Sequence, residues 1–461
     1  MSMTTRITPA RITLVCATTL AFALCGHAAS IPDEVKGGIT ERVDRGKSPS
    51  IVVGLVGPDS VEYFSYGKAS LPDGAAVDEN TVYEIGSITK VFTAILLADM
   101  AERGEVSLTD PIEKYLPKEV KAPKADGKSI LLEHLSIQNS GLPAMPTNFR
   151  PKDMANPFAD YTVAMLHEFV GKAIPRPGVG EKYLYSNVGV GLLGHLLERA
   201  SGKGFEQLVL DRISTPLGMS DTRIVFSDSM LARLAKPHAD GKEGKNWDIG
   251  SLAGAGALRS TAKDMIRFVQ ANLGQIDSPL FKAMEETHKP RAEAGSDTMH
   301  IGLGWHILTT PAGNDIVWHN GGTGGYHTFA GFLKNTKTGV VVLANDANQN
   351  CDDIGIHLLD ASVPMGGLIK RTAIEVPRTI LERYVGRYAL EPGGFLDIEL
   401  RDDGLYAKPP GVPFTRIQAE SETAFFLEEG DVLFEFQRDE KGSVDGFVVH
   451  QGAITFKATK K

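Results

Sequence analysis

Two residues near position 90 have the types and the spacing for nucleophilic chemistry. Ser87 carries a hydroxyl and Lys90 an amine, directly before the apolar helical pattern of residues 91–100. Side chains at positions i and i+3 share one face of a helix, so the Lys90 amine can reach the Ser87 hydroxyl and activate it as a nucleophile. Gly86 permits a tight entry to this helix, and first-turn N–H groups favour developing negative charge. The same pattern also arises by chance on solvated helix surfaces, so it needs support from other residues.

A second polar pair stands between the Pro/Gly loop of residues 175–180 and the helical run of residues 188–200. Tyr185 beside a lysine ammonium would lose its proton more easily, because positive charge favours the phenolate. It could then share acid/base work with Lys90. The alternative is a packing tyrosine with a satisfied hydroxyl. Asn187 could orient Lys90 and bind a substrate carbonyl, or it could simply cap the following helix.

A third candidate segment is the glycine-rich run of residues 318–326, which contains His319, Gly321 and Gly322. Glycines beside a strand let a substrate lie close and let backbone N–H groups point inward, as an oxyanion hole requires. The N–H groups of Gly322 and Ser87 could form one. His319 could bind a substrate carboxylate or the tyrosine of the second pair; the alternatives are a structural histidine and a flexible loop. A phosphate-binding loop is excluded because no Lys-Ser/Thr follows the glycines.

The elements around these segments predict an α+β domain. Residues 51–56 and 61–66, separated by turn-forming residues, indicate a hairpin. The nucleophile helix is expected to end at Gly104, and the chain is mostly helical up to about residue 275. Strand patterns return at residues 303–308, 315–318, 328–333 and 339–344. This order predicts a sheet closed by both ends of the domain, with an all-helical insertion between them.

The pattern changes again near residues 374–378. Short apolar runs at near-regular spacing follow, and charged residues or glycines separate them. Such spacing predicts a separate antiparallel barrel or meander of about 80 residues. The expected organisation is a signal peptide at 1–28, a catalytic domain at 29–370 and a barrel domain at 379–461.

Composition sets the class of protein. The chain has 461 residues, of which 42% are hydrophobic and 23% charged, and its net charge is −9. These values are typical of a globular protein, and no basic cluster indicates nucleic-acid binding. Arg6 and Arg11 precede the apolar residues 12–24 and small residues at 26–28, which favours a secretory signal over a membrane anchor. Beyond this leader only Cys351 remains, so no internal disulfide, metal or cofactor is expected.

The three segments together resemble the active site of serine β-lactamases and penicillin-recognising enzymes. Ser87-Ile-Thr-Lys90, Tyr185-Ser-Asn187 and His319-Asn-Gly321 occur in the order and at the separations of the class C branch, which also contains D,D-carboxypeptidases, D-aminopeptidases and some esterases. Residues 83–87, 139–143, 216–219, 260–264 and 302–305 match as well. The tail from Tyr384 is similar to the lipocalin-like barrel of many such hydrolases.

The resemblance implies a β-lactamase/transpeptidase-like antiparallel sheet flanked by helices, with a helical subdomain and a small all-β barrel. Ser87 would be the nucleophile, Lys90 and Tyr185 would share the acid/base role, and Asn187 would help to hold Lys90 and the substrate amide. Gly321 and Gly322 would belong to the substrate-binding strand, with the Gly322 N–H in the oxyanion hole. The implied partner is a small molecule or short peptide.

Two positions depart from the dedicated β-lactamases. Thr89 stands where their nucleophile motif usually has serine or alanine, and His319 stands where their third motif usually has lysine. A mostly neutral imidazole holds a substrate carboxylate less firmly than an ammonium does. The expected function is therefore an exported serine hydrolase that cleaves an amide, lactam or ester. The alternatives are a D-amino-acid peptidase or D,D-carboxypeptidase, a carboxylesterase, and a non-catalytic penicillin- or peptidoglycan-binding protein.

Overall fold

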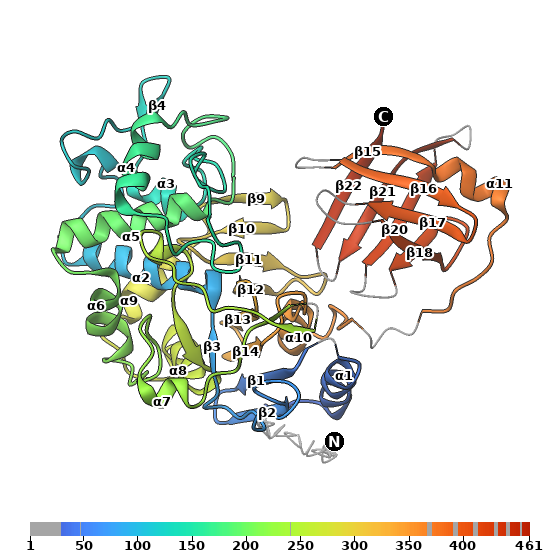
Figure 1. Cartoon of the computed structure of the whole chain (residues 1–461), viewed down its shortest axis with the longest axis horizontal. Coiled ribbons are helices and arrows are strands. Elements are labelled where there is room, and N and C mark those ends of the chain that lie inside the picture. The colour runs from blue at the N-terminus through green and yellow to red at the C-terminus, as the bar shows by residue number, and fades with distance from the viewer. Residues whose placement is uncertain are drawn as a thin grey trace, which may run out of the picture.

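The computed structural model shows an α+β region followed by a β-barrel, joined by an extended segment at 371–377 (Figure 1). It describes residues 29–46, 48–239, 241–366, 371–390, 395–408, 414–427, 432–438, 443–451 and 454–461. The expected signal peptide at 1–28 lies outside this range. No helix within the described residues has the length and apolar character needed to cross a bilayer.

The first region is built on an eight-stranded sheet in which every neighbouring pair is antiparallel. In spatial order the strands are β2 (Val61–Gly67), β1 (Ser50–Val56), β14 (Thr338–Ala344), β13 (His327–Leu333), β12 (Asp315–Gly322), β11 (His306–Thr309), β10 (Met299–Ile301) and β9 (Ala292–Ser296). The expected hairpin is β1–β2. Because β1 from the start of the domain pairs with β14 from its end, the predicted closure of the sheet is confirmed.

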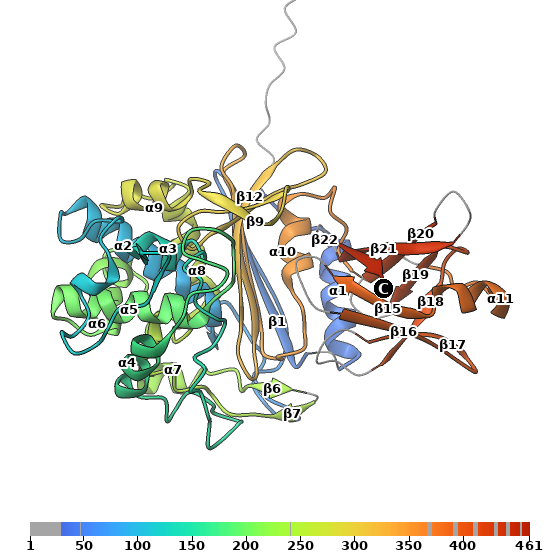
Figure 2. The same ribbon diagram turned by 90° about the horizontal axis from the view of Figure 1, so that it is seen from above.

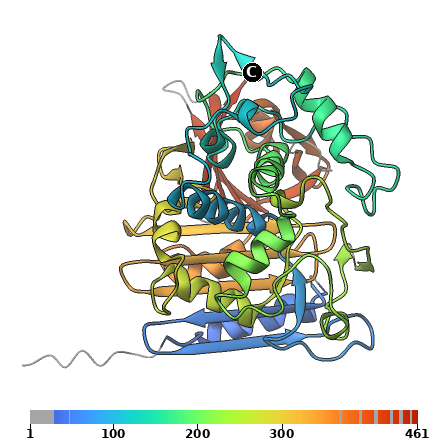
Figure 3. The ribbon, with the colours of Figure 1, turned by 90° about the vertical axis from the view of Figure 1, so that its left-hand side faces the viewer.

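Helices cover both faces of this sheet (Figure 2). On one face α1 (Asp33–Asp44) and α10 (Asp352–Leu359) pack through Val35, Ile39 and Ile354, among other apolar side chains. On the other face lie α8 (Ala262–Asn272) and α2 (Thr89–Glu102), with the remaining helices in front of the strands (Figure 3). Every residue of β1 is buried, and its β-branched side chains fill both layers.

The insertion consists of helices joined by long loops, so the expectation that it is mostly helical is wrong. Its helices are α3 (Leu132–Ser136), α4 (Val163–Lys172), α5 (Asn187–Ser201), α6 (Phe205–Val209) and α7 (Asp228–Leu231), and α9 (Phe281–Thr287) follows α8. Short turns of 3₁₀ or π type occupy Gly86–Ile88, Ile112–Lys114, Leu210–Ser214, Ala253–Ala255 and, beyond the sheet, Glu382–Tyr384.

The prediction of an all-helical insertion is wrong. Three two-stranded sheets interrupt it: β3 (Val82–Glu84) with β8 (Arg259–Thr261), β4 (Lys124–Ala125) with β5 (Lys128–Ser129), and β6 (His238–Ala239) with β7 (Lys242–Glu243). Strands of two or three residues are too short to show an alternation of apolar and polar residues, and they form only because they pair with another segment. The β3–β8 pair matters most, since it leads directly into the nucleophile turn.

The C-terminal region is a closed barrel, as the regular spacing predicted. After α11 (Arg378–Leu381) its strands are β15 (Gly386–Leu390), β16 (Phe395–Arg401), β17 (Gly404–Lys408), β18 (Thr415–Ala419), β19 (Ala424–Leu427), β20 (Val432–Arg438), β21 (Val444–Gln451) and β22 (Ile454–Lys460). The sheet closes where β15 pairs with β22. Buried side chains including Tyr388, Phe425, Phe436 and Phe447 fill the interior. The likeness to lipocalins and the domain boundaries at 370 and 379 stay predictions.

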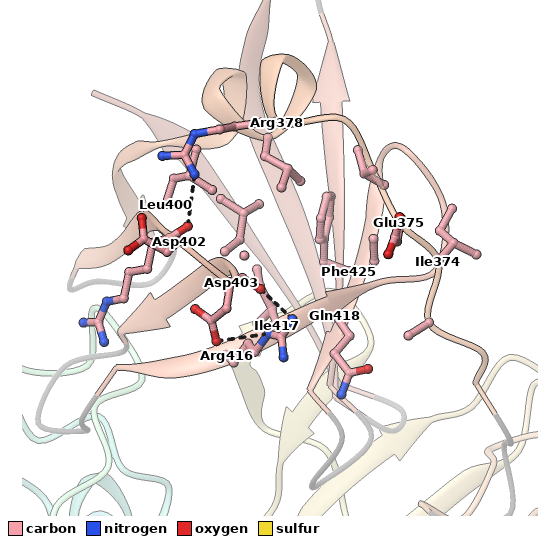
Figure 4. A pocket seen from close by; sticks show the side chains of 17 residues that line it. Ile374, Glu375, Arg378, Leu400, Asp402, Asp403, Arg416, Ile417, Gln418 and Phe425 are labelled. Carbon is pink, nitrogen blue, oxygen red and sulfur yellow. Dashed lines mark hydrogen bonds and ion pairs between the residues drawn. The ribbon is translucent and has the colours of Figure 1, made fainter.

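A cavity of about 350 Å³ lies between the segment 373–381 and strands β16–β18 (Figure 4). Its apolar lining includes Leu405, Ile417 and Phe425. Arg416 Nη2 donates to the backbone oxygen of Asp403 at 2.5 Å. Arginine and aspartate side chains both line this cavity, so its charges compensate one another.

Candidate active site

Ser87 occupies the tight turn between β3 and α2. Between Val82 and Lys90 it is the one residue that is not buried. Gly86 has a φ of +50°, a backbone conformation that side chains with a Cβ rarely adopt. Ile85 and Ile88 are fully buried on either side of the turn. These apolar anchors hold the turn while the hydroxyl of Ser87 reaches the surface.

Lys90 is completely buried below Ser87, yet its amine is fully hydrogen-bonded. Nζ lies 2.8 Å from Ser87 Oγ, 2.8 Å from Asn187 Oδ1 and 2.7 Å from the backbone oxygen of Ala255. Burial holds the pKa of Lys90 well below its usual value, so the neutral amine is favoured. A neutral amine has two N–H groups, which the Asn187 and Ala255 oxygens accept. Its lone pair is then left for the Ser87 hydroxyl, which is the arrangement of a general base.

Asn187 is the first residue of α5, and its side chain is turned toward Lys90. The cap of this helix is Ser186, whose Oγ accepts from the backbone N–H of Gly189 at 2.8 Å. The alternative in which Asn187 caps the helix is therefore wrong. Among the described residues the Asn187 amide nitrogen has only a weak acceptor, Met145 Sδ at 3.7 Å, so it remains available to a stronger one.

Tyr185 stands over the same amine. The Lys90 Nζ lies 4.9 Å from the centre of the Tyr185 ring. Burial raises the pKa of Tyr185, and a hydrogen bond with Ser87 opposes this only in part. The expectation that Lys90 eases deprotonation of Tyr185 is thus wrong for the substrate-free site. The reason is that the same burial neutralises Lys90 and removes the positive charge that would favour a phenolate.

Strand β12 brings the third segment against the nucleophile turn. A Cβ atom at Gly86 would lie 2.8 Å from the backbone nitrogen of Gly322. A Cβ atom at Gly321 would lie 2.0 Å from the backbone oxygen of Ile85, a separation that no side chain can occupy. Gly322 is exposed, and its missing Cβ would meet nothing within 4 Å. Gly321 therefore permits the close approach of the strand, while Gly322 faces open space beside Ser87.

Gly321→Ala is expected to lower turnover strongly by pushing β12 away from the turn. A displacement on the order of 1 Å costs roughly 100-fold in rate when it misplaces catalytic groups. Gly171→Ala, on the exposed surface of α4, is the matched control, since the new methyl group meets no neighbour there. The measurement is kcat/KM of both variants on one ester substrate; equal rates in both would contradict this role of Gly321.

His319 lies beneath the site as a neutral imidazole. It is 1% exposed, and burial, with His306 and Lys90 nearby, holds its pKa well below the usual value. Its Nδ1 lies 2.5 Å from the backbone oxygen of Asn320, which can only accept, so the proton is on Nδ1. Nε2 consequently carries a lone pair, and it has no partner among the described residues.

Sequence patterns did not indicate two neighbours of this histidine. The His306 ring on β11 lies 5.1 Å from that of His319, and its Nε2 is 2.8 Å from the Tyr183 hydroxyl. Burial lowers the pKa of His306 to about 4. A second neutral imidazole therefore lies beside His319, and neither ring offers a positive charge to a substrate. A single histidine in a strand carries no motif, so only the folded structure shows that His306 lies beside His319.

His327, Cys351 and Asp352 form a cluster on the other side of β12, at the start of α10. Asp352 accepts hydrogen bonds from Asn320 Nδ2 at 2.7 Å and faces His327 Nε2 at 3.0 Å. These contacts satisfy the carboxylate, and the positive end of the helix dipole favours it without a cation. The cluster ties α10 to the hairpin of β12 and β13.

Comparison with known proteins decides the family. The model of the Beta-lactamase family matches residues 35–363, which is more than half of the chain. The chain belongs to the beta-lactamase family. Residues 370–460 of this beta-lactamase-family protein match a second family, described as a domain of unknown function (DUF3471).

Curated relatives include more than one kind of enzyme. A beta-lactamase of Escherichia coli K12 is 28% identical over 374 residues, covering 73% of this chain and 95% of the relative. Penicillin-binding protein 4* of Bacillus subtilis is 26% identical, and the aligned region covers 87% of this chain and 93% of the relative. The D-alanyl-D-alanine-carboxypeptidase/endopeptidase AmpH of Escherichia coli K12 is 27% identical, covering 60% and 74%.

Solved structures show the same fold. A beta-lactamase/D-alanine carboxypeptidase from Yersinia pestis, complexed with citrate, superposes with a TM-score of 0.60 at 25% identity and covers 68% of this chain and 92% of its own. A class C beta lactamase from Rhodobacter sphaeroides gives a TM-score of 0.59 at 24% identity, covering 69% and 95%. The predicted fold class and family resemblance are confirmed for the catalytic region.

Proposed function

We propose that this protein is an exported serine hydrolase that cleaves an amide, lactam or ester bond through an acyl-enzyme on Ser87. The observation that carries the proposal is the position of Lys90 Nζ, 2.8 Å from Ser87 Oγ with its other two contacts taken by pure acceptors. Export is proposed from the basic and apolar leader at 1–28. The relatives of this protein named above support the proposed class of reaction.

Acylation begins when the Ser87 hydroxyl passes its proton to Lys90 Nζ and Oγ attacks the substrate carbonyl. The carbonyl oxygen becomes negatively charged and would be stabilised by the backbone N–H groups of Ser87 and Gly322. The close approach of Gly322 to the turn supports this pairing. Asn187 would donate its free amide hydrogens to a second substrate oxygen.

Collapse of the tetrahedral intermediate requires a proton on the leaving group. Tyr185 is suited to supply it, because burial keeps its phenol protonated and its ring lies over Lys90, which bonds to Ser87. The Lys90 ammonium formed in the first step can restore the proton to the phenol. Water would then attack the ester on Ser87 by the same steps in reverse, which frees the acid and restores the resting site.

Covalent labelling tests the proposal. The protein is incubated with a fluorescent penicillin or a fluorophosphonate, and the intact mass and the modified peptide are measured. Wild type is expected to gain one adduct on Ser87, and Ser87→Ala none. No adduct with either probe would contradict the proposal, and a stable adduct without turnover would identify a non-catalytic binding protein. Hydrolysis of nitrocefin, D-Ala-D-Ala peptides and p-nitrophenyl acetate then separates the candidate substrates.

The protonation state of His319 favours an ester or a D-amino-acid peptide as the substrate over a β-lactam. A substrate carboxylate placed against Nε2 would meet a lone pair, and neither His319 nor His306 carries a positive charge to offset the repulsion. A substrate group that donates a hydrogen bond would be accepted there. This observation supports the esterase and D-amino-acid peptidase alternatives.

His319→Lys is expected to raise kcat/KM for nitrocefin, which bears a carboxylate, relative to p-nitrophenyl acetate, which has none. A charge-assisted hydrogen bond to a carboxylate would change this ratio by about 10- to 100-fold. His319→Asn, which adds no charge, is the matched control and should leave the ratio near that of wild type. A ratio unchanged in a folded His319→Lys variant would contradict this account of His319.

A further inference from the structure

A buried ion pair stands behind the nucleophile turn. Glu84 ends β3, Arg259 begins β8, and the two residues are cross-strand partners. Their side chains are 3% and 4% exposed, and Arg259 Nη2 lies 3.2 Å from Glu84 Oε1. Neither residue belongs to the predicted catalytic set. An ion pair so completely buried is costly to desolvate, and it is stable only when further hydrogen bonds satisfy both groups.

The further bonds of Glu84 come from other segments. Its Oε1 accepts from Asn246 Nδ2 at 3.1 Å and from the backbone N–H of Trp247 at 2.9 Å. Burial raises the pKa of Glu84, whereas Arg259, Asn246, Trp247 and the Thr323 hydroxyl each oppose that rise. No hydrogen bond joins Thr323 to the carboxylate, since Glu84 Oε2 and Thr323 Oγ1 both lack a partner among the described residues.

The same network reaches the glycine hairpin by two more routes. Asn246 Nδ2 also donates to the Tyr326 hydroxyl at 2.9 Å. The Trp247 indole packs against the backbone at Gly324, where a Cβ would lie 2.5 Å from its ring nitrogen. Arg259 holds this loop in place, because its Nη2 donates to the backbone oxygen of Trp247 at 2.6 Å.

The network therefore touches both sides of the proposed oxyanion hole. Glu84 precedes Ser87 by three residues in a rigid turn, and Thr323 directly follows Gly322. The carboxylate thus directly precedes the turn that carries the Ser87 N–H, and it reaches the hairpin that carries the Gly322 N–H through Asn246 and Trp247. The separation of the Ser87 and Gly322 N–H groups matters, because donors stabilise an oxyanion only when they lie within hydrogen-bond distance of its position in the transition state.

We propose that Glu84, held by Arg259, is a positioning residue that sets the spacing of the Ser87 and Gly322 N–H groups. The proposal rests on the function proposed above. Glu84 touches no reacting atom. It acts by joining the nucleophile turn, through Asn246 and Trp247, to the glycine hairpin that contains Gly322. An ion pair that served only to stabilise the fold would affect unfolding but would not selectively weaken transition-state binding.

The test uses Glu84→Gln in the full chain, with phenylboronic acid as the probe. The boronate adds to Ser87 and becomes tetrahedral, so that one of its oxygens imitates the oxyanion. Glutamine keeps the size and one acceptor of the side chain but removes its charge. We expect boronate affinity and kcat on p-nitrophenyl acetate to fall together by about 10- to 100-fold, with KM within about twofold, since loss of one whole oxyanion donor costs roughly 100- to 1,000-fold.

Asp264→Asn is the matched control, because Asp264 is also a buried carboxylate and burial raises its pKa. Its hydrogen bonds come from Thr222 and from the backbone N–H of Asp221, away from the glycine hairpin. A Glu84→Gln variant with unchanged boronate affinity and kcat, or with losses equal to those of Asp264→Asn, overturns the inference. If Glu84→Gln does not fold, Asn246→Leu, which removes the hydrogen bonds from Asn246 to Glu84 and to Tyr326, must show the same selective loss. Wild type that neither binds the boronate nor is labelled on Ser87 overturns the proposed function, and this inference with it.

Discussion

Ser87→Ala is expected to lower kcat/KM by about four to six orders of magnitude, the loss usual when the nucleophile of an acyl-enzyme mechanism is removed. The remaining rate would come from binding and from the backbone N–H groups. The fold should be kept, because the Ser87 side chain is partly exposed and its buried neighbours Ile85 and Ile88 are unchanged. Steady-state kinetics, with thermal unfolding as a check on folding, measure both effects.

A surface serine provides the control for this change. Ser107 lies in an exposed turn, where its hydroxyl contacts Thr109, and Ser107→Ala should retain full activity. Substantial turnover by a folded Ser87→Ala variant would show that another residue attacks the substrate. In that case the arrangement of Lys90, Asn187 and Tyr185 would need a different explanation.

Lys90→Met is expected to lower the acylation rate on the order of 10³- to 10⁴-fold, because it removes the only amine within reach of the Ser87 hydroxyl among the described residues. Methionine has nearly the same length and suits a fully buried position. Lys90→Arg should be equally inactive, since a guanidinium stays protonated and cannot act as the base. Stopped-flow measurement of acylation by a fluorophosphonate or a chromogenic ester gives the rate.

The pH dependence of the wild type follows from the same lysine. The base must be unprotonated, so the acylation rate should rise with pH through the lowered pKa of Lys90 and then level off. Between this folded pKa and the higher pKa of the unfolded chain, the unfolded state binds more protons, so Lys90 makes stability rise with pH in that interval. Lys121→Met, at an exposed lysine, should leave both profiles unchanged. An acylation rate that shows no acid limb would contradict a neutral Lys90.

Much of the architecture was predictable because it depends on local patterns. The β1–β2 hairpin, the nucleophile helix and the barrel all follow from apolar periodicity and turn residues, which act over a few neighbours. The short strand β3 and the helix α1 were missed. Both depend on segments far away in the chain: β3 exists because it pairs with β8, and α1 packs on the outer face of the main sheet.

The sequence by itself determined which chemical groups are present and their order: Ser87, Lys90, Tyr185, Asn187 and His319 are recognisable from residue type and spacing. Only the tertiary structure decided their protonation states and their partners. Burial, a property of the packed domain, disfavours charge on Lys90, Tyr185 and His319 alike. The backbone oxygen of Ala255 accepts a hydrogen bond from Lys90, but the sequence does not reveal this acceptor, because every residue carries a backbone carbonyl. The same physical limit applies to Glu84 and Arg259, which are ordinary charged residues until β3 and β8 bring them together behind Ser87.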